Sequence, residues 1–213
     1  MSLASIPTEE LFRQFPVETV VSRVLEEKRE VLDSFETAYR CREAIRKQQG
    51  LKSLAFCGYG RAGKDEAGRH LIENYGYGYS GSLSRVVTPY WAWSIGRSLE
   101  ETWTTRHLHR RYWYEWTNEF RRTDPARLVR MGLGVSDLAV GIRDVVELQA
   151  VKQQRICSLL IWIDRPGIPV DPTVTYTKED CDEVIVNPGD DIEAYRKVLN
   201  EFFDGVGLSR VPM

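Results

Sequence analysis

The sequence predicts an α/β fold in which a parallel β-sheet is flanked by helices. Short apolar runs alternate with amphipathic stretches through the second half of the chain, and strands that alternate with helices imply a parallel sheet covered on both faces. The glycine-rich segment 58–65 (GYGRAGKD) stands where the first strand must turn into a helix. The 213 residues are enough for one such domain with a helical appendage.

Composition and charge narrow the class of protein. With 42% hydrophobic residues, 28% charged residues and a net charge of −2, the chain is expected to be globular rather than disordered or membrane-embedded. No apolar run approaches the ~20 residues that cross a bilayer, and the first residues lack a signal-peptide pattern. We therefore predict a cytoplasmic protein with no membrane partner. The cysteines lack a C-x-x-C spacing and are expected to be reduced thiols in the core: Cys41, Cys57, Cys157 and Cys181.

The first 50 residues are predicted to form a helical N-terminal extension. Residues 7–48 read as helix with a start at Pro16, because apolar side chains recur at helical spacing: Val17, Val21, Val24, Val31 and Phe35. We expect this extension either to cover the core or to pair with a second copy of the chain as a homodimer.

The elements of the main domain, residues 51–213, follow from periodicity and from glycine and proline boundaries. Predicted strands lie at 51–57, weakly within 75–84, and at 137–142, 158–163 and 183–186. Predicted helices lie at 64–74, over much of 85–130, and at 144–154 and 191–203. The sequence Asp124-Pro125 marks a break followed by a new helix start.

Segment 58–65, called the P-loop below, matches the phosphate-binding pattern G-x-x-x-x-G-K at Gly58, Gly63 and Lys64. Its glycines allow backbone N–H groups to point at phosphate oxygens, and the following helix N-terminus adds partial positive charge. Lys64 would reach the β- and γ-phosphates of ATP. A glycine-rich turn with a surface lysine is the alternative. The predicted ATP contacts are Gly58, Gly60, Arg61, Ala62, Gly63, Lys64, Asp65 and Glu66.

Asp65 stands where the usual pattern has Ser or Thr, whose hydroxyl binds Mg²⁺. A carboxylate also binds magnesium, directly or through water, but repels phosphates when the metal is absent. We therefore predict that Asp65 is a metal ligand and that activity depends strictly on Mg²⁺.

The motif G-Y-G-R-A-G-K-D resembles the P-loops of the bacteriophage deoxynucleoside monophosphate kinases, which end in Gly-Lys-Asp after a basic residue. Three later segments match that family in order: Gly141-Ile142-Arg143 with Glu147, Arg165-Pro166-Gly167, and Asn187-Pro188-Gly189. The likeness covers about 51–203, and residues 80–130 align only loosely.

The resemblance implies a P-loop domain of the nucleoside monophosphate kinase type, which transfers a phosphoryl group from ATP to a (deoxy)nucleoside monophosphate, in the host cytoplasm if the protein is viral. By it, Arg143 positions the acceptor or transferring phosphate, Arg165 closes over the donor, and Asn187 and Gly189 lie beside the adenine. Arg165 in a strand-end turn and a plain Asn-Pro-Gly turn are the alternatives.

Gly141 departs from the family, because many relatives have an aspartate there that organises the magnesium shell. Asp65 would then carry more of that task, or Asp144 would substitute from the neighbouring position.

Residues 85–130, called the insertion below, differ in composition from the rest of the chain. They hold five of the six tryptophans, and nine arginines against five acidic residues and no lysine, which leaves a local charge of +4. An acceptor nucleotide needs cations for its phosphate and a flat surface for its base. The predicted substrate contacts are Arg85, Arg121 and Arg122 for phosphate, Trp113 and Trp116 for the base, and, from the resemblance, Glu147.

The tryptophans equally suit core packing. His107 and His109 are expected on solvated helix surface rather than at a metal.

Two other functions fit the same features. Aromatic residues interleaved with arginines also suit single-stranded or flipped-out DNA, so a P-loop kinase acting on a hydroxymethylated pyrimidine in DNA is one alternative. A nucleotide-binding module without turnover is the other, because the strand-end aspartate is missing. The local charge of +4 is modest for a DNA-binding protein, which favours a free nucleotide.

Overall fold

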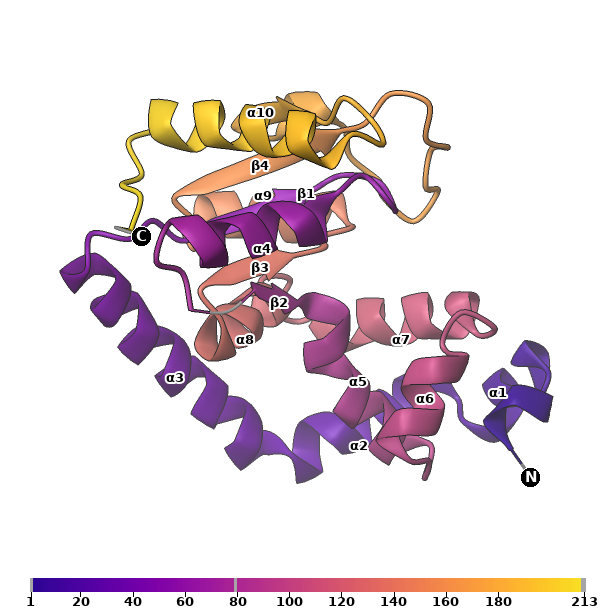
Figure 1. Cartoon of the computed structure of the whole chain (residues 1–213). Helices are drawn as coiled ribbons and strands as arrows, with labels where there is room; N and C mark the ends of the chain where they lie inside the picture. Colours follow the sequence, from indigo (N-terminus) through magenta and orange to yellow (C-terminus); the bar gives the residue numbers. More distant parts are fainter. Residues whose placement is uncertain (1, 79, 212–213) are drawn as a thin grey trace.

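The computed structural model describes residues 2–78 and 80–211 and contains a five-stranded, all-parallel sheet in the order β2-β3-β1-β4-β5 (Figure 1). The strands are β1 Leu54–Cys57, β2 Ser80–Ser82, β3 Leu138–Val140, β4 Leu159–Asp164 and β5 Glu183–Val186. The predicted α/β class with a parallel sheet is thus confirmed, including the weakly predicted strand within 75–84.

Strand β1 lies at the centre of the sheet, and its position explains its apolar sequence. Leu54 is in register with Leu138 of β3 and Leu159 of β4, and all four β1 residues are buried. A parallel strand covered on both faces has no polar side, so an unbroken apolar run is expected.

Helices cover the two faces of the sheet. Leu54 and Phe56 face α4 (Lys64–Asn74) and α10 (Ile192–Gly205), where they pack with Leu71 and Phe203. The alternate residues Ala55 and Cys57 pack on the other face with α8 (Arg127–Val135) and α9 (Val145–Gln153). The period of two along β1 therefore divides the main domain into two apolar layers.

The N-terminal segment consists of three helices rather than one. They are α1 Thr8–Gln14, α2 Val17–Glu27 and α3 Arg29–Gln48, preceded by a short 3-10 turn, η1 Leu3–Ser5. Pro16 is the N-cap of α2, in agreement with the predicted helix start there, but the continuous helix predicted over 7–48 is wrong. A residue that precedes a proline rarely adopts helical dihedrals, which separates α1 from α2 at Phe15. Lys28, with φ −106° and ψ 13°, separates α2 from α3.

The insertion folds into α5 Leu83–Ser94, α6 Leu99–Thr105 and α7 Arg110–Arg121, and it ends in the first turn of α8. These helices and the N-terminal ones form a third apolar cluster, in which Val21 and Val24 of α2 meet Trp91 of α5 and Trp116 of α7. Helix α3 runs along α8 (Figure 1). The N-terminal segment thus packs against the insertion and α8, and its pairing with a second copy stays a prediction.

The four cysteines are all free, and their burial differs. Cys57 is buried as predicted, but Cys41 is exposed on α3. The predicted core position of Cys41 is wrong because the residue lies on the solvent side of that helix.

Within residues 2–78 and 80–211, no helix has the length and apolar character needed to span a bilayer.

Candidate functional site

The P-loop connects β1 to α4 through backbone conformations that only glycine adopts freely. Gly58 has φ +120° and Gly63 has φ +103°. A Cβ at Gly58 would lie 2.6 Å from the carbonyl oxygen of Ile163, and one at Gly63 would lie 2.5 Å from Nδ2 of Asn187. The two glycines of the motif are therefore required by both backbone angle and space.

Lys64, the first residue of α4, lies against the inside of the loop. Its side-chain Nζ donates hydrogen bonds to the carbonyl oxygens of Gly58 at 2.8 Å and Tyr59 at 2.5 Å. Burial and the nearby Arg143 charge lower the pKa of Lys64 to about 8, although the Asp65 and Asp171 carboxylates oppose the shift. The ammonium group is thus held in place by carbonyl oxygens, and it forms no ion pair with the residues that the structure describes.

The first turn of α4 is open to an anion. Among the residues that the structure describes, no side chain caps this turn, so its backbone N–H groups are available to a ligand. Together with the glycine cradle and Lys64, this geometry fits a chain of phosphates. Asp65 is exposed on the same turn and borders the adjoining cavity.

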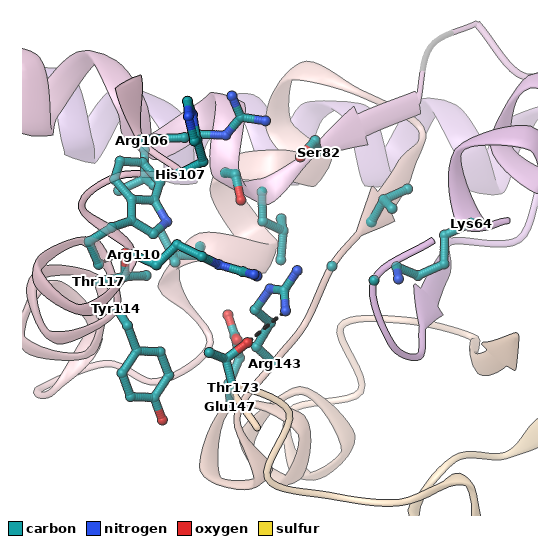
Figure 2. Close-up of a pocket in the computed structure, with 18 of the residues that line it drawn as sticks. Lys64, Ser82, Arg106, His107, Arg110, Tyr114, Thr117, Arg143, Glu147 and Thr173 are labelled. Atoms are coloured by element: carbon teal, nitrogen blue, oxygen red, sulfur yellow. Dashed lines mark hydrogen bonds between the residues drawn. The ribbon is translucent and has the colours of Figure 1, made fainter. Parts of the chain in front are cut away.

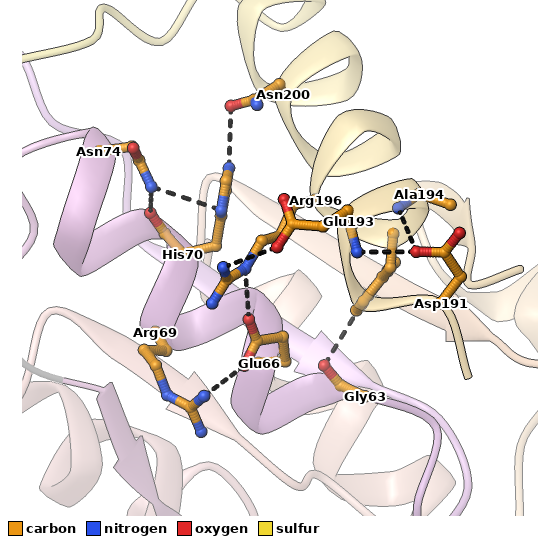
Figure 3. A network of polar contacts seen from close by, with 11 residues as sticks. Gly63, Glu66, Arg69, His70, Asn74, Asp191, Glu193, Ala194, Arg196 and Asn200 are labelled. Carbon is orange, nitrogen blue, oxygen red and sulfur yellow. Dashed lines mark hydrogen bonds and ion pairs between the residues drawn. The ribbon is translucent and has the colours of Figure 1, made fainter. Parts of the chain in front are cut away.

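Residues of α10 and of the turn after β5 contact the P-loop and the start of α4; Figure 3 shows the contacts made by α10. Tyr195 donates a hydrogen bond to the carbonyl oxygen of Gly63 at 3.3 Å, and Arg196 pairs with Glu66 at 3.0 Å. Nδ2 of Asn187 donates to the carbonyl oxygen of Ala62 at 2.8 Å. These contacts fix the loop from the side opposite the cavity.

Asn187 and Gly189, predicted beside the adenine, form part of this support. Asn187 is buried, and its Oδ1 accepts a hydrogen bond from the Gly189 N–H at 3.0 Å. Neither residue borders the cavity described below. The Asn-Pro-Gly turn therefore acts structurally in this state of the molecule, by orienting the amide that holds the P-loop.

A cavity of about 450 Å³ separates the P-loop from the insertion (Figure 2). On one side it is bordered by Gly60, Arg61, Lys64 and Asp65. The other walls combine apolar, aromatic and cationic side chains: Leu83, Val87, Trp103, Arg106, His107, Arg110, Trp113, Tyr114, Leu128 and Val140. The sheet end contributes Gly141, Arg143, Glu147 and Thr173, and α7 adds Thr117, Asn118 and Arg121.

Arg143 follows β3 and lies between the P-loop and the insertion, as Figure 2 shows. Its Nη1 donates to Oδ2 of Asp171 at 2.6 Å and to Oγ1 of Thr173 at 2.8 Å. Arg110 of α7 approaches the same Asp171 oxygen at 3.6 Å. Two guanidinium groups, one from the sheet end and one from the insertion, thus meet at one carboxylate.

Arg121 and Glu147 form a buried ion pair at the base of the cavity. Nη1 of Arg121 contacts Oε2 of Glu147, and only 2% of Glu147 is exposed. Its other oxygen, Oε1, has no hydrogen-bond partner in the described part of the chain. Burial raises the pKa of Glu147 to about 7, and the Arg121 charge opposes that rise.

The structure brings together only some of the predicted substrate contacts. Trp113, Arg121 and Glu147 border the cavity. Trp116 is instead fully buried, where its ring stacks on Phe120 at 5.1 Å and its Nε1 donates to Ser94. The core alternative therefore describes Trp116, because α7 turns that face towards the third apolar cluster.

Two predicted arginines lie outside the cavity lining. Arg122 is exposed and pairs with Glu119 one helical turn earlier. Arg85 lies over the ring of Trp103 at 5.0 Å, behind the residues that border the cavity. Their predicted phosphate contacts would therefore have to be made outside this cavity.

Arg165, which the resemblance places over the donor, lies near the P-loop but outside the cavity lining. It pairs with the exposed Asp190, and its Nη1 is 3.4 Å from the carbonyl oxygen of Arg61. Gly141 borders the cavity with φ +101°. Asp144, the predicted substitute for the missing aspartate, caps α9 by accepting at Oδ1 from the N–H of Val146, and its Oδ2 lies 3.9 Å from Arg121.

Sequence reasoning missed several cavity residues. Arg106 and Arg110 lay within the basic insertion, whose charge was the only signal for them, and nothing in the sequence distinguished Asp171. His107 is exposed and borders the cavity. The prediction for His109 is wrong: it is buried, with its ring bonded to the carbonyl oxygen of Leu3 at 3.0 Å, because α7 packs that side against the N-terminus.

Few protein side chains at this site could bind a metal ion. No group of three or more His, Cys, Asp or Glu side chains within the described ranges is arranged to hold an ion. Mg²⁺ commonly uses one or two carboxylates together with substrate phosphates and water. Asp65 fits such a site only in combination with bound phosphates.

No protein-family model matches the chain, and no curated protein matches it significantly.

Proposed function

We propose that this protein is a P-loop kinase of the nucleoside monophosphate kinase type, which transfers the γ-phosphoryl group of ATP to a (deoxy)nucleoside monophosphate with Mg²⁺. One observation carries the proposal. The P-loop lysine lies across one cavity of about 450 Å³ from a wall that bears Arg106, Arg110 and Arg143, so a phosphate donor and a phosphate-bearing acceptor can face each other within a single space.

The donor side of this cavity suits ATP. The uncapped first turn of α4 and the left-handed glycines offer N–H groups to the β- and γ-phosphates. Lys64 already projects along the loop and would exchange its contacts with the Gly58 and Tyr59 carbonyls for phosphate oxygens. A phosphate beside Lys64 also favours its charged form, which burial disfavours.

Asp65 would hold magnesium together with the phosphates. The metal would neutralise phosphate charge when bound. Since the Asp65 carboxylate itself repels phosphates, the apoprotein is expected to bind ATP weakly until a divalent cation is added.

The acceptor side supplies charge stabilisation and a surface for the base. Arg143 and Arg110 present guanidinium groups at the end of the cavity nearest the P-loop, where the transferred group carries spread negative charge. Trp113, Leu83 and Val87 offer an apolar surface against which a nucleobase can stack. The proposed catalytic residues are therefore Lys64 and Arg143, with Asp65 at the metal.

The proposal is tested by measuring ADP release and phosphorylated product with ATP, Mg²⁺ and each of the four deoxynucleoside monophosphates. We expect turnover with at least one acceptor, and we expect Lys64→Ala to lower kcat by about 100-fold or more. Lys197→Ala is the matched control, because that lysine is exposed on α10 far along the chain from the loop. Bound ATP without phosphorylated acceptor would refute the proposal.

A second candidate acceptor is a hydroxymethylated pyrimidine within single-stranded DNA. Arg85 and Arg106 lie over the Trp103 ring, at 5.0 Å and 3.6 Å. Trp103 and Arg106 border the cavity, and Arg85 lies just outside its lining. An aromatic ring with two neighbouring cations suits a base and its flanking phosphates. Phosphate transfer to a hydroxymethylated oligonucleotide, without transfer to free monophosphates, would favour this candidate.

A further inference from the structure

Asp171 belongs to none of the motifs that relate this sequence to kinases, yet it lies at the point where the two walls of the cavity meet. It follows β4 in a loop, and only 9% of it is exposed. Oδ2 lies 3.6 Å from the place that a Cβ on Gly60 of the P-loop would occupy. The carboxylate is therefore next to the proposed phosphate site.

Every oxygen of Asp171 has a partner. Oδ1 accepts hydrogen bonds from the N–H and the hydroxyl of Thr173, at 3.0 Å and 2.6 Å. Oδ2 accepts from Arg143 at 2.6 Å and pairs with Arg110 at 3.6 Å. The hydrogen bonds from Thr173 and Arg143 hold the pKa of Asp171 down at about 2 despite its burial, so the group stays ionised.

This arrangement joins two parts of the fold that are distant in sequence. Arg143 follows β3, whereas Arg110 begins α7 in the insertion. Figure 2 shows the two guanidinium groups beside each other within the cavity. A guanidinium has five N–H donors, so each arginine keeps donors that the single shared oxygen does not use and that a phosphate can accept.

The charge at this point suits a phosphate. Arg143, Arg110 and Lys64 are cations, and Asp171 is the anion that Arg143 and Arg110 share. Without that anion the two guanidinium groups would repel each other. With it, the group keeps a net positive charge and a fixed geometry.

We propose that Asp171 is a positioning residue that holds Arg143 and Arg110 together at the phosphate end of the cavity and so closes the insertion onto the P-loop. The inference rests on the proposed kinase function, since it assigns both arginines to the transferred or acceptor phosphate. Asp171 itself stays in contact with the arginines and does not touch the reacting groups.

The test compares Asp171→Asn, Asp171→Glu and Arg110→Gln in the full chain, with Asp33→Asn as the charge-matched control on an exposed part of α3. For Asp171→Asn we expect a loss of kcat/KM of about 10- to 100-fold and a raised KM for the acceptor. Asp171→Glu should restore part of the activity. Arg110→Gln should likewise raise the acceptor KM, because it removes one of the two guanidinium groups that Asp171 holds.

Binding of Mg²⁺–ATP to the same variants, measured by calorimetry, separates this inference from the kinase proposal. If the wild-type protein binds ATP but has no turnover, the kinase proposal fails, and the Asp171 role is then decided by whether Asp171→Asn weakens ATP binding relative to Asp33→Asn. An Asp171→Asn variant that folds and has the kcat/KM, acceptor KM and ATP affinity of Asp33→Asn would overturn the inference. If Asp171→Asn does not fold, Arg110→Gln with unchanged acceptor KM would overturn it.

Discussion

The two walls of the cavity differ in how they are built. The P-loop wall is one contiguous segment, 58–65, whose function depends on backbone angles and N–H groups. The insertion wall is assembled from side chains of α6, α7 and the end of β3, which meet only after those elements have packed. A site made of backbone is specified locally, whereas a site made of side chains depends on the rotation of every helix that contributes to it.

The two walls also differ in the interactions that stabilise them. The P-loop requires glycine at two positions where there is no space for a side chain. The insertion wall depends instead on polar pairs that must be satisfied in a buried setting, above all Arg121 with Glu147. Substitutions in the P-loop wall are therefore expected to act through steric clashes, and substitutions in the insertion wall through the loss of a charge partner.

Breaking the buried pair of the insertion wall should have the largest effect. Arg121→Met leaves the Glu147 carboxylate buried without its counter-charge, which is expected to lower the free energy of unfolding by about 3–5 kcal/mol. The double variant Arg121→Met with Glu147→Leu should recover most of that loss. Urea denaturation measures both, and a single variant as stable as the wild type would contradict the importance of the pair.

The same variant has a defined pH dependence. Burial already raises the pKa of Glu147 to about 7, above its ordinary 4.5, so between these two pH values the folded protein holds a proton that the unfolded chain has released. Stability from this group is present below pH 4.5 and is lost as the pH rises through the folded pKa. Without Arg121 the folded pKa rises further, and the total loss of stability between pH 5 and 8 should be larger, by about 1 kcal/mol per pKa unit.

The P-loop wall is tested by Gly63→Ala. The added Cβ would meet Nδ2 of Asn187 at 2.5 Å and the Tyr195 ring at 3.0 Å, at a backbone φ of +103°. We expect about 1–3 kcal/mol of destabilisation and a loss of ATP affinity, measured by thermal unfolding and by calorimetry. Gly207→Ala is the control, because its φ is also positive, +79°, but the space around it is open. Equal behaviour of the two variants would show that the clash is unimportant.

The smallest expected effect separates the two tryptophans of α7. Trp113→Phe should raise the KM of the acceptor by a few-fold, about 1 kcal/mol, with little change in stability. Trp116→Phe removes the hydrogen bond to Ser94 and should lower stability by about 1–2 kcal/mol without changing the KM of the folded protein. The reverse assignment, or equal effects on KM, would contradict the division between cavity and core.

Particular residues show why prediction from the sequence succeeded on one wall and not on the other. Lys64 begins a helix over Lys64–Asn74 as predicted, since the motif and the period of the following residues lie in one stretch. Trp113 and Trp116 are three residues apart on the same helix, and both match an aromatic contact for a base. Only the packing of α7 against α2 and α5 decides that Trp116 enters the apolar cluster while Trp113 borders the cavity.

Asn187 and Asp171 show what the sequence alone does not reveal. The Asn-Pro-Gly motif predicts a contact of Asn187 with adenine, whereas its amide supports the P-loop on the side away from the cavity. Asp171 has no periodic or motif signal, since it is a single aspartate between prolines in a loop. Its importance arises from two arginines that are separated from it by 28 and 61 positions in the chain.

The P-loop is thus determined by the sequence itself, because positive backbone angles and a helix N-terminus are local properties that a few glycines and one lysine encode. The parallel sheet is likewise determined by apolar runs between helices. Only the tertiary structure decided which arginines face the P-loop, which tryptophan is core, and that Asp171 joins the two walls. Those outcomes depend on long-range packing, where the rotation of a helix by one residue changes which side chains reach the site.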